Sequence, residues 1–201
     1  YVIGAGVSAA GGLPSWDGLM TTLMAASEEF VGKYPSDKVK KLLAEAKSLH
    51  HTSDYWRSTE KIEQLLPKEE YDAVVRSALS TEGRQVPDVY ELLWRLQPAG
   101  IVDFNLDDFA ARSAGQNVRT ASWNEPAKYQ QFLLSGKTFL YHAHGQFHDR
   151  KSWVLTKGAR DRVYDDQSHR RFIVTLLGTK RFVFLGFRPS DFTYAALHAM
   201  S

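Results

Sequence analysis

The sequence contains no cysteine among its 201 residues. This absence excludes disulfide bonds, thiol nucleophiles and zinc sites built from cysteine ligands. Long apolar runs are also missing. None approaches the roughly 20 residues of a membrane-spanning helix, and no basic segment precedes a short apolar stretch as in a signal peptide. We therefore expect a cytoplasmic protein that holds no metal and does not associate with a membrane.

Positively and negatively charged residues are nearly balanced. Lysine and arginine total 25 and aspartate and glutamate 23, for a formal net charge of +2. This balance gives no electrostatic reason to expect nucleic acid as a direct ligand. Apolar residues make up 43% of the sequence, enough to form a core. We expect residues 1–201 to form a single domain with an elaborated insertion, and, because the chain opens inside a strand pattern, to be a fragment of a longer protein.

Strand and helix patterns alternate along the chain. Apolar runs predict strands at 1–3, 101–104, 138–141, 153–155 and 182–185. The alternation predicts an α/β fold, a Rossmann-like parallel sheet with helices on both faces. Between the first two strands only helical patterns occur, with helix starts indicated at Ser15, Ser36, Pro67 and Pro87. We expect residues from about 31 to 97 to form a helical insertion after the first βα unit, packed as a bundle beside the sheet.

A glycine-rich turn, GAGVSA, joins the first strand to the first helix. Gly4 permits a tight turn, Gly6 lets the main chain approach a pyrophosphate, and Ala9 fills the third position of the dinucleotide-binding fingerprint. N–H groups at the helix start would face the anion. The alternative is a tight turn without a ligand. The acidic residue that usually follows about 20 residues later, after a second strand, is absent, which disfavours an ordinary nicotinamide dehydrogenase.

Polar segments also follow three later strands. They are DFNLDDF at 103–109, YHAHGQ at 141–146 and FLGFRPSD at 184–191. Ligands of doubly wound sheets bind outside the carboxyl ends of the strands. The four polar strand ends are therefore expected to converge on one cleft.

Together these motifs resemble those of the sirtuin superfamily. GAGVSAAGGLPSW is similar to its Gly-Ala-Gly-x-Ser…Gly-Ile-Pro-x-Phe signature, FNLDD to Gln-Asn-x-Asp, HAHG to His-Gly, and FLGFRPSD to the late Gly-x-Ser loop. The resemblance implies that NAD binds as a substrate. It implies nucleotide contacts from Gly4, Ala5, Gly6, Ser8, Pro14, Trp16, Gly186 and Asp191.

The departures from the family pattern point to one branch of it. The four-cysteine zinc module of deacetylating sirtuins is missing, and a helical stretch stands in its place. Trp16 replaces the expected Phe, and Arg188 stands where the family has its late Ser, within the nucleotide contact. This pattern resembles the bacterial sirtuin-like NAD hydrolases of antiphage defence. That resemblance implies cleavage of NAD⁺ to nicotinamide and ADP-ribose.

Three residues are the candidates for the chemical step. The amide of Asn105 can hold the ribose or the attacking water, because it both donates and accepts hydrogen bonds. Asp107 can receive the carboxamide N–H or stabilise positive charge, or it can be an ordinary helix cap, a role that we assign to Asp108. His144 is the candidate general base because imidazole titrates near neutral pH, although a histidine at a strand end is often structural. His142 shares its face of the strand.

Ser8 is expected to donate to a phosphate from the first helical turn, and Trp16 to cover the nicotinamide pocket or to begin the core face of its helix. Two other functions are open. One is an NAD-dependent deacylase or ADP-ribosyltransferase, which would need a protein-substrate groove. The other is a non-catalytic module that senses NAD or ADP-ribose. A hydrolase that depletes its own cell of NAD⁺ requires restraint, so we expect a homo-oligomer or a partner defence protein.

Overall fold

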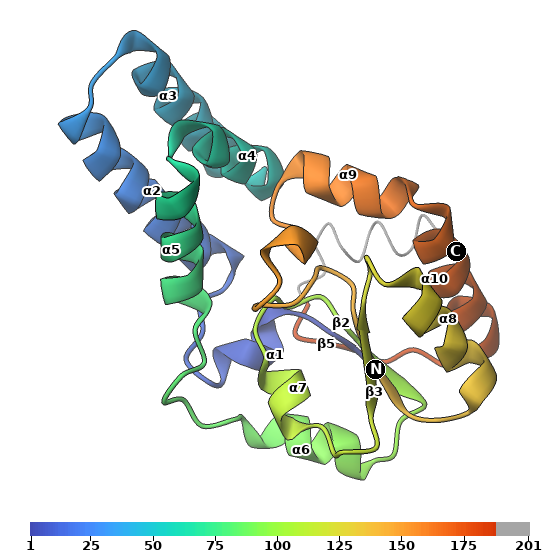
Figure 1. Cartoon of the computed structure of the whole chain (residues 1–201). Helices are drawn as coiled ribbons and strands as arrows, with labels where there is room; N and C mark the ends of the chain where they lie inside the picture. Colours follow the sequence, from blue (N-terminus) through green and yellow to red (C-terminus); the bar gives the residue numbers. More distant parts are fainter. Residues whose placement is uncertain (188–201) are drawn as a thin grey trace.

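A computed structural model describes residues 1–187 of the chain. Its elements alternate between strand and helix outside one long helical stretch (Figure 1). In chain order they are β1 (Val2–Ile3), α1 (Ala5–Ala9), α2 (Trp16–Lys33), α3 (Asp37–His51), α4 (Tyr55–Leu65), α5 (Lys68–Leu79), α6 (Asp88–Arg95), β2 (Gly100–Asp103), α7 (Phe109–Ser113), β3 (Arg119–Ser122), α8 (Pro126–Ser135), β4 (Phe139–His142), η1 (Arg150–Ser152), α9 (Lys157–Asp165), α10 (Gln167–Thr179) and β5 (Phe184–Leu185).

The five strands form one parallel sheet in the order β3-β4-β2-β1-β5. This confirms the predicted Rossmann-like α/β fold. The chain runs from β1 to β2 on one side and later adds β5 on the other, so the strand order reverses direction at β1. In open α/β sheets such a switch point opens the crevice where ligands bind.

Alternate residues of the strands point to opposite faces, and each face is covered by its own helices. On one face Val102 and Tyr141 pack against Phe172 of α10 and Tyr129 of α8. On the other face the core is formed by α1, α6 and α7, with members Ile3, Val7, Tyr90, Leu93, Ile101, Phe109 and Leu140. Both faces of the sheet are therefore buried, as a parallel sheet requires.

The helical stretch divides into two parts. Helices α2 to α5 share one core that includes Met20, Leu23, Ile62 and Val75, and they stand off to one side of the sheet (Figure 1). Helix α6 instead packs on the sheet through Tyr90. The bundle thus ends at α5, whereas the sequence extended the insertion to about residue 97. The described residues contain no strand between β1 and β2.

The predicted helix starts are confirmed. The hydroxyls of Ser15 and Ser36 accept backbone N–H groups of the first turns of α2 and α3, from Gly18 and Val39. Pro67 and Pro87 occupy the N-cap positions of α5 and α6. No helix within residues 1–187 is both long and apolar enough to span a membrane.

One strand prediction was wrong, and one strand was not predicted. Residues 153–155 form no strand, because this buried run packs its side chains against α4, α9 and the bundle core, and no strand lies beside it. A short apolar run does not distinguish these situations. Strand β3 (RTAS) was missed because it is an edge strand paired only with β4, so two of its residues are exposed and its sequence is polar.

Arg150 is one of the residues that join the bundle to the segment after β4. Arg150 in η1 forms ion pairs with Glu63 of α4 and Asp72 of α5. Its guanidinium also lies 4.9 Å from the ring centroid of Trp153 and 5.5 Å from that of Tyr71. The segment after β4 is thereby fixed against the insertion.

Candidate active site

A pocket lies at the carboxyl ends of β1, β2 and β4, where the insertion leaves the sheet. Its lining combines polar strand ends with apolar side chains of the bundle. The lining residues are Ala5, Ser8, Leu13, Pro14, Ser15, Trp16, Leu19, Leu79, Phe104, Asn105, Leu106, Asp107, His144 and Leu155. The structure therefore brings together all three predicted catalytic residues with Ala5, Ser8, Pro14 and Trp16.

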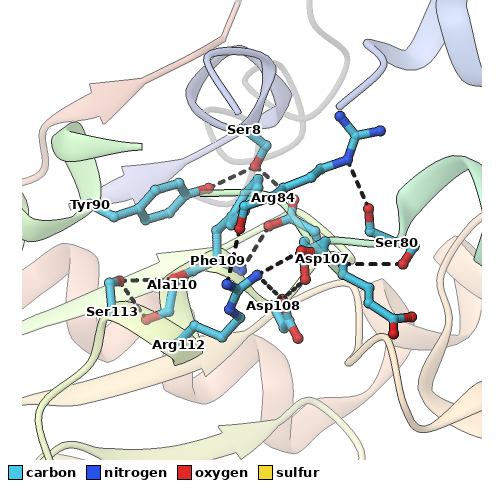
Figure 2. A network of polar contacts seen from close by, with 12 residues as sticks. Ser8, Ser80, Arg84, Tyr90, Asp107, Asp108, Phe109, Ala110, Arg112 and Ser113 are labelled. Carbon is cyan, nitrogen blue, oxygen red and sulfur yellow. Dashed lines mark hydrogen bonds and ion pairs between the residues drawn. The ribbon is translucent and has the colours of Figure 1, made fainter. Parts of the chain in front are cut away.

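Ser8 is the centre of the polar network beneath this pocket. Its hydroxyl donates to Asp107 Oδ2 at 2.6 Å, and it accepts from Asn105 Nδ2 at 3.1 Å. The Tyr90 hydroxyl lies 2.7 Å away and, since the hydrogen of Ser8 is already used, acts as the donor (Figure 2). In this arrangement Ser8 has no proton left for a phosphate. It orients Asn105 and Asp107 instead.

Asn105 and Asp107 are held from both sides. The amide of Asn105 also donates to the carbonyl of Gly4 at 3.1 Å, which joins the end of β2 to the glycine turn. Burial raises the pKa of Asp107, while the hydrogen bond from Ser8 and the N–H of Phe109 favour its ionised form. Both carboxylate oxygens thus accept protein hydrogen bonds, and the side chain is fixed at the pocket floor.

The sequence assigned the helix cap to Asp108, but the side chain of Asp108 does not make the capping hydrogen bond. Asp108 occupies the N-cap position of α7, but its side chain makes no capping hydrogen bond. The N–H of Phe109 donates to Asp107 Oδ1 at 3.0 Å instead. Asp108 accepts from the hydroxyl of Thr81 and lies 3.9 Å from Arg112 Nη1, in the network that ties the segment after α5 to α7 (Figure 2). Asp107 therefore combines the role of a cap with a position in the pocket.

His144 is too deeply buried to titrate as a solvent-exposed histidine does. It is 3% exposed, and the rings of Phe104 and Trp56 meet its ring edge-on at centroid distances of 4.7 and 5.4 Å. Burial lowers its pKa to about 3, against a smaller opposing effect of a hydrogen bond with the backbone of Phe104. The ring is therefore neutral near pH 7, and the expectation that it titrates near neutrality was wrong in this environment.

The neutral imidazole still presents an acceptor. Its Nε2 is buried and has no hydrogen-bond partner within residues 1–187. The hydrogen bond with the Phe104 backbone is therefore made by Nδ1. This bond favours the tautomer with the proton on Nδ1, in which the lone pair of Nε2 is free. A neutral ring with an unused lone pair is the form that accepts a proton.

Trp56 of the insertion contacts this histidine, and Trp16 packs in turn on Trp56. Trp16 at the start of α2 is half-buried in the pocket wall, 4.9 Å from the Trp56 ring and stacked on Tyr55 at 6.4 Å. Trp16 therefore begins the helix and lines the pocket, and its cover of the nicotinamide stays a prediction. The bundle thus contributes the apolar wall opposite the strand ends.

The glycines of the first turn pack against the segment after β5 and do not face the pocket. A Cβ on Gly6 would lie 2.8 Å from the Cα of Gly186, and the N–H of Gly6 donates to the Gly186 carbonyl at 3.0 Å. Gly186 itself has a φ of +73° and packs on Gly4 and Val7. The turn after β5 approaches these glycines so closely that it leaves no room for side chains. Asp191 and Arg188 lie outside the described residues.

We expect Gly6→Ala to destabilise the fold. The added Cβ must displace the backbone of Gly186, which costs at least about 1 kcal/mol. Gly178→Ala in α10 is the matched control, because its Cβ would meet nothing within 4 Å. Urea unfolding measures both. Equal stability of Gly6→Ala and the parent would contradict the packing role.

Sequence reasoning missed three contributors to the site. Tyr90 and Trp56 lie in helical patterns of the insertion, and the sequence did not single them out as site residues. Asp103 was counted as the end of a strand, yet it is 0% exposed. Of these three residues only Asp103 gave a signal in the sequence, because it is an acidic residue within an apolar strand.

The residues of this region carry a family signature. A model of the SIR2-like domain matches residues 99–198, about half of the chain, and this range includes Asn105, Asp107 and His144. The chain therefore contains a sirtuin-like domain, and members of this family are NAD-dependent enzymes. A comparison with curated proteins found no match. Within residues 1–187 no group of three or more histidine or acidic side chains is placed to hold a metal ion.

Proposed function

We propose that the protein hydrolyses NAD⁺ at the nicotinamide–ribose bond and releases nicotinamide and ADP-ribose. The observation that carries this proposal is the convergence of Asn105, Asp107 and His144 on one pocket whose opposite wall is apolar. The sirtuin-like family match supports NAD as the substrate.

The chemistry needs little covalent help from the protein. The C1′–N bond breaks with its electron pair going to nicotinamide, which leaves as a neutral molecule without protonation. Water then bonds to C1′ and loses a proton. Positive charge builds on the ribose in between, so fixed negative charge and a dry, oriented site lower the barrier.

Each candidate residue is suited to one part of this reaction. The Asp107 carboxylate, held by Ser8 and the Phe109 N–H, supplies negative charge at a fixed place. The Asn105 side-chain oxygen is available to the ribose or the water, since this amide donates to Gly4 and Ser8 through its nitrogen. Nε2 of His144 accepts the proton of the water. Trp16 lies where the nicotinamide ring would be excluded from solvent.

We place the nucleotide phosphates at the glycine turn, with Ala5 in the pocket wall and Gly4, Gly6 and Gly186 shaping the backbone beneath it. The carboxyl edge of the sheet at β1 is the position that the fold offers for such a group. Because the Ser8 hydroxyl is satisfied inside the protein, main-chain N–H groups are the donors in this proposal.

The product analysis separates hydrolysis from its alternatives. The protein is incubated with NAD⁺ in the presence and absence of an acetyl-lysine peptide, and the products are identified by mass spectrometry. We expect ADP-ribose and nicotinamide in equal amounts in both reactions. O-acetyl-ADP-ribose in the peptide reaction would instead identify a deacylase, and intact NAD⁺ with measurable binding would identify a sensing module.

We further propose that this activity depletes cellular NAD⁺ during antiphage defence, under restraint by self-assembly or by a partner protein. Induced expression of the active protein in a bacterial host should lower the NAD⁺ pool and arrest growth. The Asn105→Ala protein, expressed to the same level, should do neither. Growth arrest by both proteins with a normal NAD⁺ pool would contradict this role.

A further inference from the structure

Asp103 and His142 form a buried polar pair beneath the pocket that the proposed reaction does not use. They end β2 and β4 and lie opposite each other in the parallel register. Asp103 is 0% and His142 2% exposed. Asp103 Oδ2 and His142 Nδ1 are 3.7 Å apart, and neither atom has a hydrogen-bond partner among the described residues. Leaving two such polar atoms unsatisfied is costly unless they serve each other.

The other oxygen of Asp103 leads directly to the candidate catalytic residue. Asp103 Oδ1 accepts the backbone N–H of Asn105 at 2.8 Å, which closes the turn where β2 ends. The same Asn105 then donates its side-chain amide to Gly4 and Ser8. A rotation of the Asp103 carboxyl would therefore release the backbone that carries this amide.

The protonation states of the pair favour a neutral arrangement. Burial, followed by the nearby charge of Asp107, raises the pKa of Asp103. Burial lowers the pKa of His142 to about 4. A protonated carboxyl at Oδ2 can donate to the bare Nδ1 of a neutral imidazole, while Oδ1 stays an acceptor for Asn105.

We propose that Asp103 and His142 are a positioning pair: one proton between Oδ2 and Nδ1 holds the carboxyl so that its other oxygen fixes Asn105. His142 thus acts on the reacting site through two intermediates and touches no substrate. Its relevance to turnover rests on the proposed NAD⁺ hydrolysis. The positioning itself does not, because it concerns only the orientation of Asn105.

The kinetic test compares substitutions that keep or remove the Asp103–Asn105 hydrogen bond and the proposed proton-sharing contact between Asp103 and His142. Asp103→Asn keeps an acceptor for Asn105 and supplies an N–H donor for His142, so it should retain most of the rate of nicotinamide release. Asp103→Leu removes both bonds and should lower kcat about tenfold or more while the KM for NAD⁺ changes little. Ser122→Ala is the matched control. Ser122 is also buried, pairs with His142 across β3 and β4, and has no bond to Asn105.

A second readout is independent of turnover. In ¹⁵N NMR spectra the side-chain amide of Asn105 should shift in His142→Phe, which leaves Asp103 Oδ2 without its partner, and remain near its parental position in Ser122→Ala. Superimposable Asn105 resonances in His142→Phe and the parent would overturn the positioning pair, as would a parental kcat for Asp103→Leu. If the parent releases no nicotinamide, hydrolysis is refuted, and the NMR comparison still decides the pair.

Discussion

We expect His144→Ala to release nicotinamide from NAD⁺ about a hundredfold more slowly than the parent, or more slowly still, while remaining folded. General-base assistance typically contributes about 10²–10⁴-fold to a rate. The unpartnered Nε2 of His144 is the group placed to supply it. Asn105→Ala should lose turnover to a similar extent, because the amide proposed to hold the ribose or the water is gone.

The affinity for NAD⁺ should change far less than the rate in both variants, because the proposed phosphate contacts at the glycine turn are unchanged. Calorimetry on the two variants measures this, and circular dichroism verifies their folding. His51→Ala is the matched control, since His51 is an exposed histidine near the end of α3. Undiminished nicotinamide release by folded His144→Ala would show that another group acts as the base.

The second large effect is on stability in acid. Burial lowers the pKa of His169 to about 4, from an ordinary value of 6.5. Between these values the unfolded chain binds a proton that the folded protein does not bind, so the free energy of unfolding falls as the pH falls. Between pH 7 and pH 5 this one residue should account for about 2 kcal/mol of lost stability.

His169→Gln isolates this contribution. Glutamine does not titrate, and its side-chain oxygen can still accept from the Tyr141 hydroxyl, which lies 2.6 Å from His169 Nδ1. Asp103 and Asp107 act in the opposite direction, because their raised pKa values favour the folded state as the pH falls. These residues are unchanged in the variant and cancel in the comparison. Urea unfolding at pH 7 and pH 5 should show a shallower pH dependence in His169→Gln, and parallel curves for the two proteins would refute the assignment.

The sequence was sufficient for the parts of the fold that local patterns encode. Apolar runs followed by polar turns located four of the five strands to within two residues, and serine and proline marked the helix starts. Strand β3 escaped because an edge strand with one neighbour does not need an apolar sequence. Residues 153–155 were misassigned because burial against helices produces the same apolar run as burial in a sheet.

The sequence was enough to predict which residues form the site, but not the environment of each residue. The rule that ligands bind at the carboxyl ends of parallel strands brought Asn105, Asp107 and His144 together from the sequence alone. The pKa of His144 depends on Trp56, a residue of the insertion far away in the chain, so no local pattern reveals it. The same holds for Gly6, whose close neighbour is Gly186 on the last strand and not a ligand.

The central claim is that the pocket at the carboxyl ends of β1, β2 and β4 binds NAD⁺ with the scissile bond beside Asn105, Asp107 and His144. The most direct measurement is a crystal structure of the His144→Ala protein with NAD⁺, in which the substrate stays intact. We expect the nicotinamide ribose within hydrogen-bond distance of the Asn105 side chain, the nicotinamide ring near Trp16 and the phosphates at the turn of α1. NAD⁺ bound at any other place on the protein, with this pocket empty, would contradict it.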